Sequence, residues 1–505
     1  MSDALHTAPL VEPPVPRALA TAPAEKQQLL GQFFSPRAVA DLLASFVKFD
    51  GADVRMLEAG AGAGALIAAT VRRVCATKTR PRSFSVEAWE IDDAVIPELR
   101  RTLDECARLC SAAGICFEAH LHQGDFIAAA VERTRDDWFA GEAHGYTLAV
   151  LNPPYRKISG DSRERLLLRS AGIETSNLYT GFLALAARLL EPHGQLVAIT
   201  PRSFCNGPYF RPFREDLLSR LALRRVHVFE SRSAVFRSDA VLQENVIIHA
   251  VRETPRDAAV MISSSSGEAG ATFSERAIPL CEVVRPDDKE QFIRLPSDDR
   301  FADAASALAK LDSTLESLGV SVSTGRVVDF RARDFLRECA GSDTVPLVYP
   351  CHFNGGWVHW PRKDARKPNA IVHCDATRDL LVPEGVYVLV KRFTAKEERR
   401  RVVASIWNPA KCAPGPVGFE NHLNYFHIRG TGLDAAFAHG LAAFLNSTVL
   451  DDCFRLFSGH TQVNATDLRS LRYPSRKMLV ELGKKAAPGT AQTEIDAAVQ
   501  RIVFA

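Results

Sequence analysis

The segment Asn152-Pro153-Pro154-Tyr155 combines groups that suit chemistry on a planar substrate with an exocyclic amine. Its two prolines fix the backbone and remove two N–H donors, which leaves carbonyl groups to face a cleft. The side-chain carbonyl of Asn152 and the main-chain carbonyl of Pro153 can both accept hydrogen bonds from an NH2 group, and this takes the nitrogen lone pair out of conjugation. The ring of Tyr155 can stack on the substrate. The alternative interpretation is a proline-rich turn after a strand.

A glycine-rich segment, Glu58-Ala59-Gly60-Ala61-Gly62-Ala63-Gly64, comes earlier in the chain, between a predicted strand and a predicted helix. Glycines allow a ligand to approach the backbone closely, and the N-terminus of the helix presents free N–H groups. Taken alone, such a loop also fits an ordinary strand–helix turn. A dinucleotide site would need a further small residue, which Ala65 supplies only loosely.

Two more acids extend the candidate cofactor site. Glu90, followed by Ile91, ends the next predicted strand, where a carboxylate can accept hydrogen bonds from ribose hydroxyls. Asp125, followed by Phe126, can bind the amino edge of an adenine and cover its face. The alternatives are a solvated strand-end acid for Glu90 and a helix N-cap for Asp125. Because Glu58 and these two acids end successive predicted strands, together they favour a cofactor of the adenosine type.

Alternating apolar strands and helices are predicted to position these residues. The pattern is typical of an α/β domain with a mixed, mostly parallel sheet. The predicted strands are residues 54–57, 85–89, 147–151, 195–199, 225–229 and 245–251. The predicted helices are residues 41–47, 65–74, 94–109 and the apolar run 178–190, which we expect to be buried.

Composition divides the chain into a tail and two domains. Residues 1–24 are rich in Ala, Pro and Thr and predict a flexible tail. Residues 25–280 form the α/β domain, in which the serine-rich segment 263–270 predicts a surface loop or hinge. Over residues 285–505 the alternation fades, and aromatic residues, Gly, Pro and basic clusters are interspersed, which predicts a second domain of mixed α+β structure.

The overall composition excludes several classes of protein. The 505 residues are 46% hydrophobic and 24% charged with a net charge of +2, which is ordinary for a globular chain with a sizeable core. No run approaches the roughly 18 apolar residues that cross a membrane, and the N-terminus lacks the apolar core of a signal peptide. The eleven cysteines include no C-x-x-C pair, which favours reduced thiols and the cytoplasm.

A metal site has to be considered where cysteine and histidine residues gather in the second half of the chain. The spacing of this group matches no usual zinc pattern, and we expect no metal there. Its members are Cys351, His352, His359, His373 and Cys374.

With these motifs in this order, the chain resembles the gamma-class N6-adenine DNA methyltransferases. Gly31-Gln32-Phe33-Phe34-Ser35-Pro36 resembles the opening motif of that family, whose aromatic and Ser/Thr-Pro elements touch the methionine part of S-adenosylmethionine. The resemblance therefore implies a Rossmann-like methyltransferase domain followed by a target-recognition domain. It implies that the cofactor is held by Phe33, Ser35, Pro36, Glu58, Gly60, Gly62, Glu90, Ile91, Asp125 and Phe126.

The same resemblance implies a set of catalytic residues. These are Asn152, Pro153, Pro154 and Tyr155, with Phe236 as an aromatic side chain that stacks on the extruded base from its other face. The alternative for Phe236 is a core phenylalanine in a hairpin. The chain departs only mildly from the motifs of that family. Ser35 stands where Thr is commoner, and the glycine loop is rich in alanine.

Other segments resemble a narrower group, the modification methylases of type II restriction–modification systems that include the PstI and BsuBI methylases. The segments are Asn177-Leu178-Tyr179, residues 201–207, residues 243–246, Ser323-Thr324-Gly325 and residues 457–463. The resemblance implies a bacterial, cytoplasmic, monomeric enzyme. It would methylate adenine N6 in a short duplex DNA sequence and protect it from a partner restriction endonuclease.

The resemblance suggests a role for three basic clusters. Residues 156–169, 207–225 and 391–401 each hold several arginines or lysines, which we expect to contact DNA phosphates. The alternative for each cluster is a solvated protein face.

Other functions remain open alternatives. An Asn-Pro-Pro-Tyr motif also suits methylation of RNA or of a protein glutamine, although such enzymes rarely need a long region after the catalytic domain. A combined restriction–modification polypeptide would need a nuclease carboxylate cluster, which we do not find. A non-catalytic DNA-binding protein conflicts with the intact motif. A cytosine-C5 enzyme would need a Pro-Cys pair after the cofactor motifs, whereas Pro350-Cys351 lies in the second domain.

Overall fold

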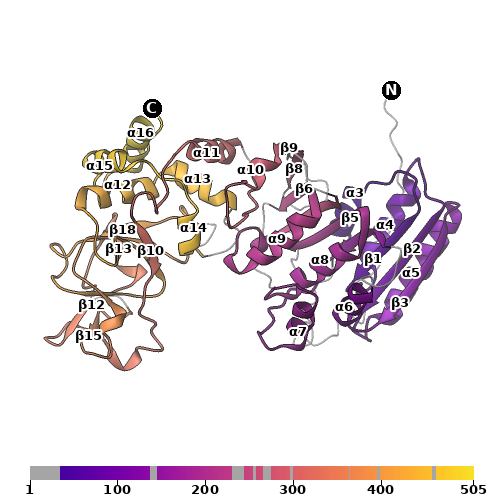
Figure 1. Ribbon diagram of the computed structural model, residues 1–505, viewed down its shortest axis with the longest axis horizontal. Helices are drawn as coiled ribbons and strands as arrows, with labels where there is room; N and C mark the ends of the chain where they lie inside the picture. Colours follow the sequence, from indigo (N-terminus) through magenta and orange to yellow (C-terminus); the bar gives the residue numbers. More distant parts are fainter. Residues whose placement is uncertain are drawn as a thin grey trace. The chain divides into compact units, whose positions relative to one another are not determined.

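The computed structural model describes residues 35–136, 145–229, 244–253, 258–265, 274–295, 299–362, 364, 366–394, 398–457 and 462–505. The chain divides into two compact units, Met1–Glu282 and Val283–Ala505, and Figure 1 follows it through both. The predicted tail, Phe33 and Phe236 lie outside the described residues.

A nine-stranded sheet with the order β3-β2-β1-β4-β5-β7-β6-β8-β9 forms the centre of the first unit. The strands from β3 to β5 are parallel, and β7 runs antiparallel to both β5 and β6. The bounds are β1 Val54–Ala59, β2 Ser83–Glu90, β3 Cys116–Gln123, β4 Tyr146–Leu151, β5 Leu190–Pro201, β6 Leu221–Phe229, β7 Asn245–Arg252, β8 Ala259–Ser265 and β9 Ser274–Pro279. The predicted mixed, mostly parallel α/β sheet is confirmed.

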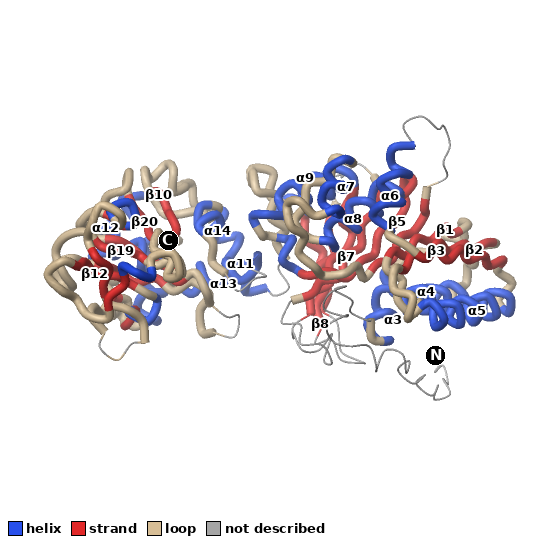
Figure 2. The backbone as a smooth tube through the Cα atoms, turned by 90° about the horizontal axis from the view of Figure 1, so that it is seen from below, coloured by secondary structure: helices blue, strands red, loops and turns tan. Residues whose placement is uncertain are grey.

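Helices cover both faces of this sheet (Figure 2). One face carries α3 Arg37–Phe46, α4 Ala65–Ala76 and α5 Ile96–Ala112. The other carries α6 Phe126–Asp136, α7 Arg163–Ser170, α8 Leu178–Leu189 and α9 Arg211–Arg220, with the 3-10 turns η1 Arg202–Cys205 and η2 Pro208–Phe210 nearby in sequence. Strand β2 shows why the layers form, because its residues alternate between buried and partly exposed, and Phe84 and Val86 enter the core beneath α4 and α5. The predicted buried helix over 178–190 is confirmed as α8.

The prediction of a surface loop or hinge at residues 263–270 is wrong for the part that the structure describes. Ser263 and Ser265 belong to β8 and are buried in the sheet. The buried ring of His227 on β6 explains these polar residues, because its Nδ1 lies 3.0 Å from Ser263 Oγ and its Nε2 lies 3.0 Å from Ser265 Oγ. By composition alone, a strand whose serines contact a buried histidine cannot be told from a serine-rich loop.

The second unit combines two small sheets with helices, as the α+β prediction requires. The six-stranded sheet has the order β10-β20-β17-β18-β14-β13, and the five-stranded sheet has the order β11-β15-β12-β19-β16. The strands are β10 Ser321–Thr324, β11 Leu336–Arg337, β12 Thr344–Val348, β13 Phe353–Asn354, β14 Trp357–Val358, β15 Ala370–Val372, β16 Leu381–Val382, β17 Tyr387–Lys391, β18 Ala404–Trp407, β19 Val417–Phe419 and β20 Leu423–His427.

The helices of this unit pack on the larger of its sheets. They are α10 Leu280–Val283 at the junction, α11 Asp299–Ala309, α12 Ala435–Leu445, α13 Thr448–Phe457, α14 Ala465–Arg469, α15 Arg476–Lys485 and α16 Gln492–Val503, with the turns η3 Arg333–Phe335, η4 Pro350–His352 and η5 Arg378–Leu380. Helices α12 and α15 approach backbone to backbone at Gly440 and Gly483. A Cβ atom on Gly440 would lie 1.7 Å from the carbonyl oxygen of Leu479, so only glycine fits.

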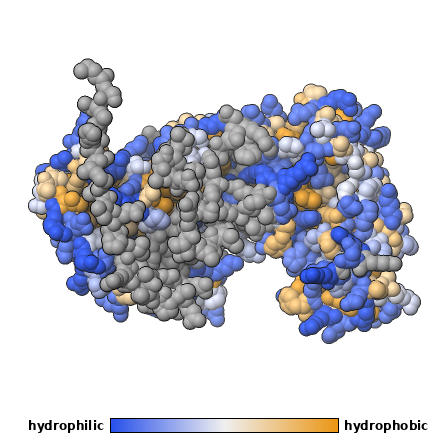
Figure 3. All heavy atoms as spheres, turned by 180° about the vertical axis from the view of Figure 1, so that it is seen from behind, coloured by the Kyte–Doolittle hydropathy of each residue, from blue (hydrophilic) through white to orange (hydrophobic). Residues whose placement is uncertain are grey.

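The described residues contain no helix with the length and apolar character needed to cross a bilayer. On the face drawn in Figure 3, apolar residues are scattered among hydrophilic ones. The same residues include no group of three His, Cys, Asp or Glu side chains placed to hold a metal ion. His352, from the group considered for zinc, is buried and hydrogen-bonds through Nδ1 to the N–H of Tyr349 and through Nε2 to Asn369 Oδ1.

Candidate active site

The glycine loop and the Asn152 motif begin at the same edge of the sheet. Strands β1 and β4 are parallel neighbours, with Met56 paired to Leu148, and each motif directly follows its strand. The chain leaves β1 towards β2 on one side and leaves β4 towards β5 on the other. Ligands of open α/β sheets bind at such a switch point. The two motifs also lie close together, because a Cβ atom built on Gly60 would come within 4.0 Å of Pro154 Cδ.

The backbone of the glycine loop takes a conformation that other residues rarely adopt. Gly60, Gly62 and Gly64 have φ angles of 78°, 55° and 82°. A Cβ atom on Gly64 would also lie 2.9 Å from the side chains of Leu99 and Thr102 on α5. Glycine is therefore required here both for the backbone angle and for the close packing of the loop against α5.

Glu90 holds this loop to the end of β2. Its buried carboxylate accepts hydrogen bonds from the N–H of Gly62 at 2.7 Å and from those of Ile91 and Asp92 at 2.8 Å each. The solvated strand-end acid that the sequence left open is therefore wrong. The next side chain, Ile91, is 56% exposed and leaves an apolar surface beside the loop.

Glu58 is a buried acid at the base of the same loop. It is 2% exposed, and its Oε2 atom has no hydrogen-bond partner among the residues described. Burial raises the pKa of Glu58 well above the ordinary value of a carboxyl group, the N–H of Ile67 opposes this shift, and the nearby charge of Glu90 adds to it. The side chain therefore carries its proton in this structure at pH values where exposed carboxyl groups are ionised.

Asp125 caps helix α6, as the alternative interpretation proposed. Its Oδ1 accepts hydrogen bonds from the N–H of Ile127 at 2.9 Å and of Ala128 at 3.3 Å. Its Oδ2 accepts a bond of 2.9 Å from Arg163 on α7. Phe126 is buried, and its ring packs against Phe182 with the centroids 5.2 Å apart. Arg163 is thus the partner of Asp125 that sequence reasoning did not identify.

The side chain of Asn152 contacts Ser35, a residue of the opening motif. Its Nδ2 donates a hydrogen bond of 3.0 Å to Ser35 Oγ, although the two residues are 117 positions apart. Ser35 comes directly before Pro36, the residue that caps α3. The sequence placed Ser35 and Pro36 with the cofactor and gave no sign of this contact with Asn152.

Two contacts hold the side chain of Tyr155. Its hydroxyl donates a hydrogen bond of 3.2 Å to the carbonyl oxygen of Ile199 on β5. Its ring packs edge-on against Tyr179 of α8, at a centroid distance of 6.1 Å and an angle of 76°. Burial raises the pKa of Tyr155 well above its ordinary value, so the phenol stays protonated. Tyr179 belongs to the segment Asn177-Leu178-Tyr179, whose resemblance was the only sequence signal for it.

Comparison with known proteins gives the family. The chain is 43% identical over 470 residues to the type II methyltransferase M.PstI of Providencia stuartii, covering 92% of this chain and 91% of that protein. It is 40% identical over 481 residues to the type II methyltransferase M.BsuBI of Bacillus subtilis, covering 94% of each. The chain belongs to the type II methyltransferases of restriction–modification systems. The resemblance stated from the sequence is confirmed.

Two further matches of this methyltransferase cover different shares of the chain. The family model of the Eco57I restriction-modification methylase matches residues 103–236. Among solved structures, the type IIG restriction endonuclease BpuSI aligns with a TM-score of 0.45 at 12% identity, over 95% of this chain and 64% of that one.

The basic cluster after the Asn152 motif is largely neutralised by acids of the methyltransferase itself. Arg156 pairs with Glu164 at 2.7 Å, and Arg165 and Arg169 both pair with Glu174. These ion pairs hold the loop and α7 together. The expectation that the cluster faces DNA phosphates thus has no support from its geometry.

The arginines of the second basic cluster also bind groups within the protein. Arg211 and Arg220 pair with acids one helical turn away on α9. The fully buried Arg214 donates to the carbonyl oxygens of Phe204 and Gly207. These contacts also stabilise the fold of the first unit.

Proposed function

We propose that this methyltransferase transfers a methyl group from S-adenosylmethionine to the N6 amine of an adenine in a short duplex DNA sequence. The observation that carries the proposal is that the glycine loop and the Asn152 motif lie side by side at the switch point of the sheet. A cofactor on the loop and an amine at Asn152 would then be neighbours. The test is to incubate the enzyme with duplex DNA and labelled cofactor and to identify the methylated nucleoside by mass spectrometry. We expect N6-methyladenine, and N4-methylcytosine would contradict the proposal.

The residues at the loop fit S-adenosylmethionine, which supplies the methyl group. The buried Oε2 of Glu58 suits a cationic group of the ligand, because it has no hydrogen-bond partner in the described part of the chain. Exposed Ile91 offers an apolar surface for the adenine ring. The residues that would hold the cofactor are Phe33, Ser35, Pro36, Glu58, Gly60, Gly62, Glu90, Ile91, Asp125 and Phe126.

The catalytic motif would act on a base that has left the duplex, since its amine cannot be reached inside the stack. Asn152 Oδ1 and the carbonyl of Pro153 would accept hydrogen bonds from the amine, which localises the lone pair on nitrogen and aims it at the methyl group. Pro154 would hold this backbone against the glycine loop. Tyr155 would support the ring on one face, with Phe236 on the other. Most of the rate enhancement would come from positioning and electrostatics.

We expect cofactor affinity to rise with pH. Glu58 must lose its proton before it can pair with a cation, and burial keeps that proton bound above the ordinary pKa of a carboxyl group. Below the raised pKa of Glu58, the affinity should therefore increase by up to about tenfold per pH unit, and above it the affinity should level off. Calorimetric titrations in buffers of different ionisation enthalpy should detect release of a proton on binding. Glu58→Gln should bind more weakly and without this pH dependence, and a pH-independent wild type would contradict the assignment.

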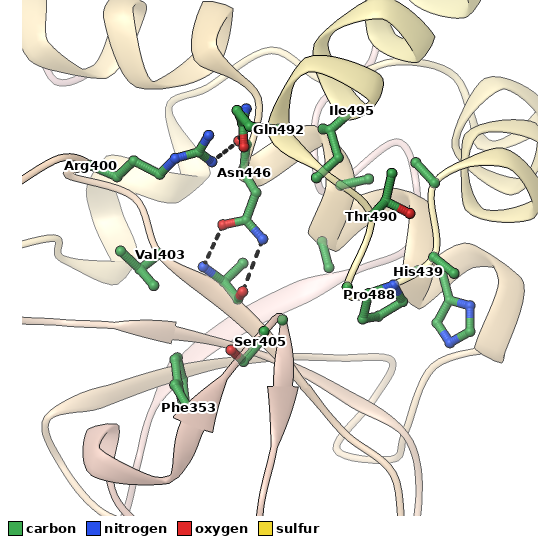
Figure 4. Close-up of a pocket in the computed structure, with 18 of the residues that line it drawn as sticks. Phe353, Arg400, Val403, Ser405, His439, Asn446, Pro488, Thr490, Gln492 and Ile495 are labelled. Atoms are coloured by element: carbon green, nitrogen blue, oxygen red, sulfur yellow. Dashed lines mark hydrogen bonds between the residues drawn. The ribbon is translucent and has the colours of Figure 1, made fainter.

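The third basic cluster supports DNA as the partner. Lys391, Arg399 and Arg400 line a cavity of about 470 Å³ in the second unit, and no acidic side chain lines it. Figure 4 shows Arg400 turned towards Asn446, whose main-chain carbonyl oxygen accepts its hydrogen bond. Neither Lys391 nor Arg399 forms an ion pair with a residue that the structure describes, and Lys391 Nζ lies 5.9 Å from the centroid of the Phe353 ring. We propose that these two side chains contact the phosphate backbone and that this unit recognises the target.

Replacing both side chains should reduce the salt dependence of DNA binding. Each lost phosphate contact lowers the slope of log K against log salt by about 0.9. Lys391→Ala with Arg399→Ala should therefore lower the slope by up to about 2 and should weaken cognate and non-cognate DNA alike. Arg211→Ala is the matched control, because Arg211 already pairs with Glu215 at 2.8 Å. If the double variant and the control show the same slope as the wild type, Lys391 and Arg399 do not touch phosphates.

We propose finally that the enzyme works as a monomer in the bacterial cytoplasm, where it protects target sites from a partner restriction endonuclease. Membership of the type II methyltransferases supports this setting. Mapping methylated bases in DNA from cells that express the enzyme would identify the protected sequence.

A further inference from the structure

The hydrogen bond from Asn152 Nδ2 to Ser35 Oγ connects the proposed catalytic amide to a rigid part of the fold. Helix α3 begins two residues after Ser35, and its buried residues Val39 and Leu43 pack into the core beneath the sheet. Beyond the end of α3, the N–H and carbonyl groups of Lys48 both hydrogen-bond to the side chain of Gln195 on β5. The segment that presents Ser35 is thus tied to the same sheet that presents Asn152.

A hydrogen bond at this nitrogen would affect catalysis in two ways. The terminal torsion of an asparagine has a broad energy profile, so a fixed partner at Nδ2 narrows the range of positions that the carbonyl samples. Donation by Nδ2 also polarises the amide and makes Oδ1 a stronger acceptor, as in other chains of hydrogen bonds. Both effects favour an acceptor that must meet an amine at one place.

We infer that Ser35 is a positioning residue for Asn152. The inference rests on the proposed function, and it gives the hydroxyl of Ser35 a role beyond the cofactor contact implied by the opening motif. It acts through Asn152 and requires only a hydroxyl at this position. A threonine, the commoner residue there in the resembling family, should therefore serve as well.

The first test separates a role in positioning from a role in cofactor binding. Ser35→Ala should lower the single-turnover rate of methyl transfer by roughly 2- to 12-fold at saturating cofactor and DNA, the range for loss of one hydrogen bond. Its cofactor affinity, measured by calorimetry, reports separately on the cofactor contact proposed for Ser35, and that contact does not affect a rate measured at saturating cofactor. Ser35→Thr should restore the rate. Weaker cofactor binding with an unchanged rate at saturation would overturn the inference.

The second test asks whether Ser35 acts through Asn152. Adding Ser35→Ala to Asn152→Ala should cause no further loss of rate, because the bond is already absent, whereas independent effects would multiply. Equal losses in the two backgrounds would overturn the inference. Unfolding curves of each variant without ligand establish that it is folded. Failure of the proposed function would appear separately, as a wild-type product other than N6-methyladenine, and the rate comparison could still be made on that product.

Discussion

Asn152→Ala should slow methyl transfer by about 100-fold or more while the affinities for cofactor and DNA stay within about tenfold. In the proposed mechanism the hydrogen bond from the target amine to Asn152 Oδ1 would strengthen as the nitrogen becomes nucleophilic, so its loss should raise the barrier more than it weakens binding. Removing one preorganised polar group of this kind typically costs about 100- to 1,000-fold in rate. The measurement is single-turnover transfer of labelled methyl to duplex DNA, with affinities determined in parallel.

A second asparagine provides the control for this prediction. Asn177 precedes α8 in the same unit, and its Nδ2 donates to the neighbouring Ser176 Oγ at 3.2 Å. Asn177→Ala removes the same chemical group without touching the catalytic motif, and it should transfer methyl groups at close to the normal rate. Near-normal transfer by Asn152→Ala would remove Asn152 from the mechanism.

The strands and helices that carry the site could be predicted because their signals are local. The apolar run before the Asn152 motif became β4, and the run before the glycine loop became β1. The parallel neighbours of such strands follow from the alternation of strands and helices. Strands β8 and β9 were missed, because their serines and charged residues lack the apolar pattern of a core strand.

The partners inside the site could not be predicted, because they depend on contacts between distant segments. Nothing near Glu90 in sequence indicates that its carboxylate ties down Gly62, and nothing near Asp125 indicates Arg163. A cluster of arginines also looks the same whether its charges face a solvent-filled groove or acids of the same chain. In this protein the acids were sequence neighbours, such as Glu174 for Arg169, but only the fold shows that the side chains meet.

Tyr155 offers the second large effect, and its two functional groups can be separated. Tyr155→Ala removes a stacking surface worth about 1–3 kcal/mol, so retention of the extruded base should weaken by roughly 5- to 150-fold and the transfer rate should fall as well. Tyr155→Phe keeps the ring and loses the hydrogen bond to the carbonyl oxygen of Ile199. It should therefore cost roughly 2- to 12-fold, the range for one hydrogen bond.

Both variants can be followed with 2-aminopurine at the target position, whose fluorescence reports the unstacked base, alongside single-turnover transfer to normal DNA. The ring of Tyr155 rests edge-on against Tyr179, so phenylalanine should keep the same orientation and most of the fluorescence change, whereas alanine should lose it. If phenylalanine were as impaired as alanine, the anchoring hydroxyl rather than the stacking face would carry the effect. Tyr155 would then act by holding the end of the catalytic motif to β5, because its ring would contribute little to retaining the base.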